Sequence, residues 1–135
     1  MEKAWAKITG NYERADEGGY MPNGLRSLTG VPVFIYFTFD IYNSSDADAI
    51  WQTMKTADQA GYLLAAIALY SNTDTIYNPC GIPKFHAYTL LSAFEMTESN
   101  GTTHKMFLMR NPWGITGYNS DWSYNDTRWT DALVA

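Results

Sequence analysis

One stretch, residues 85–114, constrains the fold of this 135-residue chain more than any other. Two apolar runs, 85–91 and 104–109, flank a polar tip at Ser99-Asn100-Gly101. Asn-Gly between two apolar runs is a strong hairpin signal, because both residues tolerate positive φ. The sequence therefore predicts two antiparallel strands joined by a tight turn.

This hairpin is expected to bring two chemically useful side chains to one end of the sheet. His86 stands at the start of the first strand, and Asn111 follows the second. A histidine that transfers protons needs one ring nitrogen held by a partner, so that the other faces the reacting atom. An asparagine oxygen can accept that hydrogen bond without burying a second charge, as in the Cys-His-Asn form of the nucleophilic triad. A lone histidine at a strand start is more often structural, and the pairing with Asn111 favours the catalytic interpretation.

The hydrophobic pattern predicts further helices and strands around the hairpin. Residues 2–8 and 46–60 are expected to be helices, and 31–39 and 63–70 to be strands. The polar, glycine-rich residues 11–23 are expected to form a solvated loop. Together these elements predict an α+β fold with a mainly antiparallel sheet and a few flanking helices.

Composition limits the classes of partner and compartment. Apolar residues make up 46 % of the chain and charged residues 17 %, which predicts one folded domain over residues 1–135. A net charge of −5 without any basic run argues against nucleic acid as a partner. No apolar run approaches the length of a membrane span. The single cysteine, Cys80, cannot form an internal disulfide, which favours a reducing, cytoplasmic location.

Three segments of the chain carry the pattern of one enzyme family. They are Glu-Lys-Ala-Trp-Ala-Lys at 2–7, Gly-Leu-Arg-Ser-Leu-Thr-Gly at 24–30, and the His-Ala-Tyr strand at 86–88 combined with Arg-Asn-Pro-Trp-Gly at 110–114. In combination they resemble the second catalytic subdomain of calpain-type, papain-like cysteine proteases. The resemblance covers most of the chain and implies the β-rich half of a papain-like fold.

The resemblance also implies roles for three side chains. His86 would be the general base and the partner of a thiolate, and Asn111 would orient its ring. Trp113 would cover that hydrogen bond from water, where a lower dielectric strengthens it. The nucleophilic cysteine and the oxyanion-hole glutamine of the family would belong to a preceding, cysteine-bearing half that is missing from this chain.

Cys80 is not expected to be that nucleophile. In papain-like enzymes the histidine follows the cysteine by roughly 130 to 150 residues, whereas Cys80 lies in a loop shortly before His86. It also lacks the helix N-terminus that would lower a thiol pKa. A zinc site of Cys80, His86 and His104 lacks ligand number and spacing, so no metal is assigned and His104 is expected to be a surface residue.

Two departures from the family pattern stand out. Phe85 occupies the position before the histidine, where calpains usually have glycine. Gly117 and Tyr124 stand where members of this calcium-activated family often carry acidic calcium ligands, with Asp121 and Asp126 nearby but displaced. No cofactor is therefore expected in this chain, and calcium remains a property that the resemblance implies for the parent family.

The sequence thus favours part of a calpain-like intracellular cysteine endopeptidase that hydrolyses peptide bonds in protein substrates. Alone, without the cysteine-bearing half, the chain is expected to be inactive. The alternative is a non-catalytic calpain-like module that binds protein partners. Phe85 and the unmatched calcium ligands favour this alternative. A generic α+β domain is disfavoured by the joint matches at 2–7 and 110–114.

Overall fold

A computed structural model describes residues 1–16, 18–37, 44–68, 77–115 and 117–134. By its internal contacts the chain divides into two compact units, Met1–Thr38 and Phe39–Ala135. Each unit is built from elements close together in sequence. The expectation of a single domain over residues 1–135 stays a prediction.

The first unit contains three short helices: α1 (Glu2–Thr9), α2 (Tyr12–Asp16) and α3 (Met21–Thr29). The helix predicted at residues 2–8 is confirmed as α1. The solvated loop predicted at 11–23 is wrong, because that stretch contains α2 and the start of α3. Asn11 caps α2 by accepting the Arg14 backbone N–H at 2.8 Å, and Pro22 lies in the first turn of α3, where its missing N–H costs nothing.

The strand predicted at residues 31–39 is also wrong over its described part. Residues 31–37 adopt no regular secondary structure, and 38 and 39 lie outside the described residues. Several of their large side chains are exposed, Phe34 by 80 %. Alternating β-branched and aromatic residues favour a strand, but a strand forms only where another strand pairs with it. The described sheet contains no strand from this segment.

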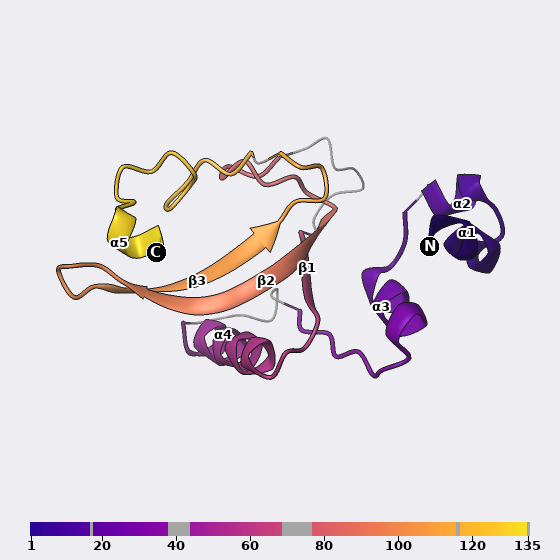
Figure 1. Cartoon of the computed structure of the whole chain (residues 1–135), viewed down its shortest axis with the longest axis horizontal. Helices are drawn as coiled ribbons and strands as arrows, with labels where there is room; N and C mark the ends of the chain where they lie inside the picture. Colours follow the sequence, from indigo (N-terminus) through magenta and orange to yellow (C-terminus); the bar gives the residue numbers. More distant parts are fainter. Residues whose placement is uncertain (17, 38–43, 69–76, 116, 135) are drawn as a thin grey trace. The chain divides into compact units, whose positions relative to one another are not determined.

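The second unit holds the sheet. Its elements are α4 (Ser44–Gln59), β1 (Leu64–Ala68), β2 (His86–Thr97), β3 (Thr103–Arg110) and α5 (Asp131–Val134). The strands run antiparallel in the order β1-β2-β3, with α4 packed against β2 and β1 (Figure 1). The predicted α+β class, hairpin and second helix are confirmed, and the strand predicted at 63–70 is present as β1, with 69 and 70 outside the described residues.

α4 packs on the sheet through one aromatic side chain and two ion pairs. Trp51 is buried, with the ammonium groups of Lys55 and Lys105 4.9 and 5.3 Å from its ring centroid. Lys55 pairs with Glu95 of β2 at 2.9 Å, and Lys105 of β3 pairs with Asp48. None of the helices in the described part of the chain is long and apolar enough to cross a membrane.

A β-bulge interrupts β2 between Leu90 and Ser92. Asp58, at the end of α4, accepts hydrogen bonds there from the Ser92 hydroxyl and the Ala93 backbone N–H, each at 3.0 Å. Side chains alternate along a strand, so one extra residue changes which face the remainder of the strand presents. The bulge therefore sets the face from which His86, at the start of β2, projects.

Candidate functional site

The hairpin brings His86 and Asn111 together at one end of the sheet. His86 is the first residue of β2, and Asn111 directly follows β3. His86 Nε2 lies 2.9 Å from Asn111 Oδ1, although the residues are 25 apart in sequence. The imidazole is buried, with 7 % of the residue exposed. The predicted juxtaposition is present in the structure.

A second hydrogen bond fixes the chemistry of this pair. Asn111 Oδ1 also accepts the backbone N–H of Trp113 at 3.0 Å. A backbone N–H can only donate, so the amide atom that faces it is the oxygen. That oxygen can only accept, so His86 Nε2 carries the proton and donates it. The neutral ring then keeps its lone pair on Nδ1, available for a reacting group.

Two aromatic rings flank the imidazole. The Trp113 ring lies with its centroid 4.2 Å from that of His86, tilted by 46°. Tyr88, on the same strand, meets the imidazole edge-on at 4.8 Å and 86°. Desolvation, with a smaller contribution from Tyr77, raises the pKa of the Tyr88 phenol. Tyr88 therefore stays neutral and adds no charge beside the pair.

Phe85 adopts a backbone conformation that explains its unusual position. Its φ is +52°, in the left-handed region that favours glycine, and 54 % of the residue is exposed. The chain must turn there to begin β2 with a buried histidine. Glycine can make this turn without steric cost, which accounts for its expected presence at this position in the resembled family.

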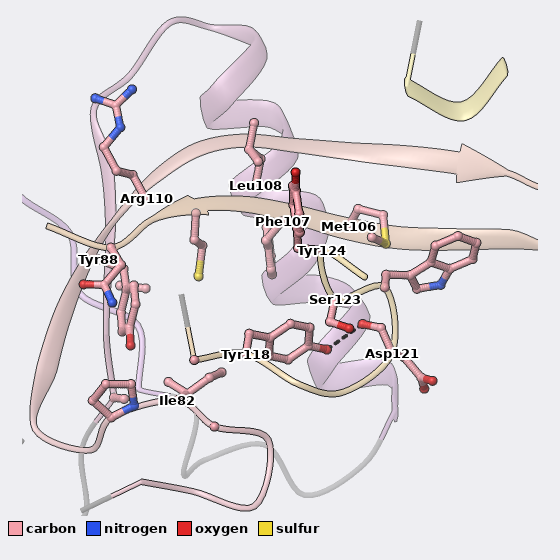
Figure 2. A pocket seen from close by; sticks show the side chains of 18 of the residues that line it. Ile82, Tyr88, Met106, Phe107, Leu108, Arg110, Tyr118, Asp121, Ser123 and Tyr124 are labelled. Carbon is pink, nitrogen blue, oxygen red and sulfur yellow. Dashed lines mark hydrogen bonds between the residues drawn. The ribbon is translucent and has the colours of Figure 1, made fainter. Parts of the chain in front are cut away.

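A groove of about 950 Å³ adjoins the His86–Asn111 pair. Asn111 and Tyr88 lie in its wall, together with apolar side chains of β3 and tyrosines of the C-terminal segment (Figure 2). The lining includes Ile82, Met106, Leu108, Tyr118 and Tyr124. Its size lies at the upper end of ordinary ligand sites, and its chemistry suits apolar and aromatic groups.

Cys80 lies in the loop that forms one side of this groove. Its backbone N–H donates to Asn78 Oδ1 at 2.9 Å, and its carbonyl accepts the Asn119 N–H at 3.0 Å. The thiol is free and half-buried, and within the described part of the chain no hydrogen bond joins it to His86. The prediction that Cys80 is not the nucleophile stays a prediction.

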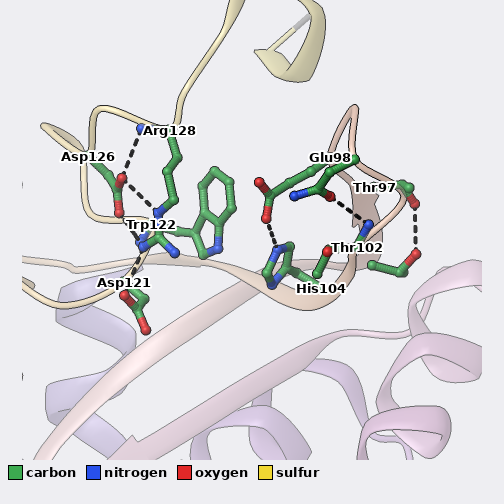
Figure 3. A network of polar contacts seen from close by, with 10 residues as sticks. Thr97, Glu98, Thr102, His104, Asp121, Trp122, Asp126 and Arg128 are labelled. Atoms are coloured by element: carbon green, nitrogen blue, oxygen red, sulfur yellow. Dashed lines mark hydrogen bonds and ion pairs between the residues drawn. The ribbon is translucent and has the colours of Figure 1, made fainter.

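His104 has a more defined environment than the sequence indicated. Its Nε2 lies 2.5 Å from Glu98 Oε1, and its ring lies 5.1 Å from that of Trp122 (Figure 3). The missed signal was the position of Glu98 across the hairpin turn, six positions before His104. Among the described residues, no group of three histidine, cysteine or acidic side chains is arranged to hold a metal ion.

Asp121 and Asp126 both pair with one arginine. Arg128 Nη2 lies 2.8 Å from Asp121 Oδ1 and 2.6 Å from Asp126 Oδ2. Hydrogen bonds from the Arg128 side chain are the main reason that the pKa of Asp126 lies well below its usual range. Both carboxylates are therefore paired with a cation that the chain itself supplies.

The sequence is similar to proteins of one known family. Residues 1–133 match the family described as calpain family cysteine protease. The calpain-type cysteine protease DEK1 of Arabidopsis thaliana is 32 % identical over 136 residues, and the calpain-2 catalytic subunit of Homo sapiens is 33 % identical over 131. Calpain-5 of Caenorhabditis elegans is 28 % identical over 154 residues. These alignments cover 96 to 100 % of this chain but only 6, 18 and 24 % of the three relatives, respectively.

Proposed function

The chain belongs to the calpain family of cysteine proteases, and we propose that it supplies the proton-transfer half of a peptidase active site. In this proposal His86 is the general base, Asn111 orients it, and Trp113 shields the hydrogen bond between them. The observation that carries the proposal is the 2.9 Å contact between His86 Nε2 and Asn111 Oδ1. It leaves Nδ1 as the nitrogen that exchanges a proton with the reaction.

The proposed reaction is acyl transfer from a peptide bond. A cysteine thiolate attacks the carbonyl carbon, and the His86 imidazolium gives its proton to the leaving amine. The neutral imidazole then takes a proton from water, which attacks the thioester and releases the acid. Expulsion of the thiolate restores the thiolate–imidazolium pair. Asn111 remains neutral throughout and holds the ring through both steps.

We propose that the nucleophilic cysteine comes from sequence outside these 135 residues. The chain has one cysteine, and Cys80 has no hydrogen bond to His86 among the described residues. The chain also corresponds to a minor part of each relative's length. A general base without a nucleophile does not cleave an amide, so the isolated chain should be inactive.

The substrate is proposed to be a protein segment lying beside the His86–Asn111 pair. Trp113 is 42 % exposed, so its ring can contact a substrate while it packs on His86. The neighbouring groove, lined by Tyr88 and Leu108 among others, would accept apolar side chains. Its openness to bulky groups suits an endopeptidase rather than an enzyme for a small polar metabolite.

The test is casein cleavage by a protein in which a cysteine-bearing half precedes this chain. We expect cleavage, its loss in His86→Ala, and its retention in the control Glu95→Gln. Glu95 pairs with Lys55 between β2 and α4 and is not among the residues that line the groove. Equal activity of the His86→Ala and unsubstituted proteins would refute the assigned base.

A second function, a non-catalytic module that binds protein, is favoured by one observation. Phe85 places an exposed aromatic ring beside the site, at a position whose backbone suits glycine. A well-folded two-half protein that cleaves nothing, yet retains casein in a pull-down, would support this second function over the peptidase.

A further inference from the structure

The C-terminal segment 117–129 closes on itself through the Arg128 guanidinium. Nη2 contacts one oxygen of Asp121 at 2.8 Å and one of Asp126 at 2.6 Å, while Nε donates to the other Asp126 oxygen at 3.0 Å (Figure 3). The arginine thus uses its planar fork on both oxygens of Asp126 and bridges to Asp121. Two carboxylates of one segment converge on one positive group.

Aromatic packing and backbone hydrogen bonds complete this arrangement. The Arg128 Cζ atom lies 4.5 Å from the centre of the Trp122 ring. The ring centroids of Trp122 and Trp129 are 5.0 Å apart. The Trp122 backbone, with φ +60°, donates its N–H to Asp126 Oδ2 at 2.7 Å. The Trp129 indole N–H donates to the Ser123 carbonyl at 2.8 Å. Asp126 therefore joins the backbone at Trp122 and at Arg128 to the Arg128 side chain.

The same residues do not fit calcium, which the resemblance to this calcium-activated family implies. Calcium takes six to eight oxygen ligands, and Asp121 and Asp126 are already engaged by Arg128. At the two positions where acidic ligands are expected stand Gly117 and Tyr124. Gly117 packs directly on the Gly81 backbone, and Tyr124 is 86 % exposed. The segment thus has two carboxylates paired with Arg128 in place of a set of oxygen ligands for calcium.

We propose that Arg128 is an internal cation that holds segment 117–129, so that the order of this segment does not depend on calcium. The inference deepens the proposed peptidase function. Only the consequence for catalysis rests on that proposed function. That consequence is a groove that is formed before substrate binds. Tyr118 of the same segment lies in the groove wall, and its hydroxyl donates a hydrogen bond to the Asp121 carbonyl (Figure 2).

Amide hydrogen exchange of the 135-residue chain tests the proposal without any activity assay. The probes are the Trp122 and Arg128 amides, both of which donate to Asp126. We expect the same protection in excess calcium and in excess EGTA. Arg128→Ala should lower protection at both amides by about 10-fold or more. The closed segment then lacks the positive charge that stabilises it, so it opens more often. Calcium should not restore the protection.

Two further variants make the result specific. Arg128→Lys keeps the charge but loses the fork, so intermediate protection is expected. Arg26→Ala, in the first unit, removes an arginine outside the Asp121–Asp126 network and should change nothing at the probes. Protection of the β2–β3 hairpin amides reports in each variant that the chain is folded.

Two results would overturn the inference: protection in the unsubstituted chain that rises on adding calcium, or full protection in Arg128→Ala. Neither result bears on His86, whose role is decided by casein cleavage. A failure of the proposed peptidase function is therefore distinguishable from a failure of the internal cation.

Discussion

A Cβ atom placed on Gly81 would lie 1.8 Å from the carbonyl oxygen of Gly117. The loop that precedes β2 and the C-terminal segment therefore cross backbone to backbone, joined by the hydrogen bond from Asn119 N to the Cys80 carbonyl. Both glycines also line the groove.

Gly81→Ala should destabilise the chain by about 2 to 5 kcal/mol. Gly81 has φ +76°, so alanine incurs a left-handed penalty of about 1–2 kcal/mol and an overpacking cost of about 1–3 kcal/mol. Gly101→Ala is the matched control, since φ is +87° but no atom lies within 4 Å of the new Cβ. Urea unfolding of both variants checks the difference, and equal losses would contradict the crossing.

Asn111→Ala should lower kcat of the two-half enzyme by about 10- to 100-fold. The hydrogen bond to a histidine that becomes charged is worth about 1.5–3 kcal/mol, which corresponds to that factor in rate. Asn111→Asp keeps the acceptor for His86 and Trp113, and it should retain more activity. Steady-state kinetics on a peptide substrate decide this. Unchanged kcat in Asn111→Ala would leave this side chain with a structural role only.

Phe85→Gly should be more stable than Phe85→Ala by about 1 kcal/mol. Both variants remove the exposed ring, but only glycine relieves the left-handed backbone at φ +52°. Thermal unfolding of the two variants measures the difference. If alanine proved equal to glycine, the positive φ of this residue would not be a source of strain.

Lowering the pH should release the Arg128 network only below about pH 4. The folded-state pKa of Asp126 is depressed, chiefly by the hydrogen bond from Arg128. Its stabilisation is therefore fully present above the unfolded value near 3.9 and is lost as pH falls towards the folded value. The difference in near-ultraviolet circular dichroism between the unsubstituted chain and Asp126→Asn should stay constant from pH 7 to about 5 and shrink below pH 4. A transition near pH 6 would point to a different titrating group.

Asp58→Ala should destabilise the chain by about 1–3 kcal/mol, because it leaves the Ser92 hydroxyl and the Ala93 N–H without their acceptor. Asp58→Asn keeps one acceptor oxygen and should cost less. Glu95→Gln is the control, since it removes an exposed ion pair between α4 and β2 worth at most about 1 kcal/mol. Denaturant midpoints of the three variants rank these effects, and a larger loss in Glu95→Gln would be inconsistent with the bulge contact.

The hairpin and the contact between its two ends were predictable, because Asn-Gly turn chemistry and strand alternation act over short distances. The exposed run at residues 31–37 was misassigned because strand propensity has no effect without a partner strand. Helix α3 was missed because its polar composition hid the Met21-Pro22 start. The Arg128 network depends on turns whose geometry no periodic pattern encodes.

Folding order follows from the connectivity of the hairpin. His86 and Asn111 meet through neighbouring strands and a short turn, a closure that typically takes about 1–10 μs. The crossing of Gly81 and Gly117 joins a loop before the hairpin to a segment after it, so the chain must close a longer loop to form it. We therefore expect the His86–Asn111 pair to assemble early and the groove wall late. Pulse-labelling hydrogen exchange during refolding would show the β2–β3 amides protected before the Asn119 amide, and the reverse order would exclude this sequence of events.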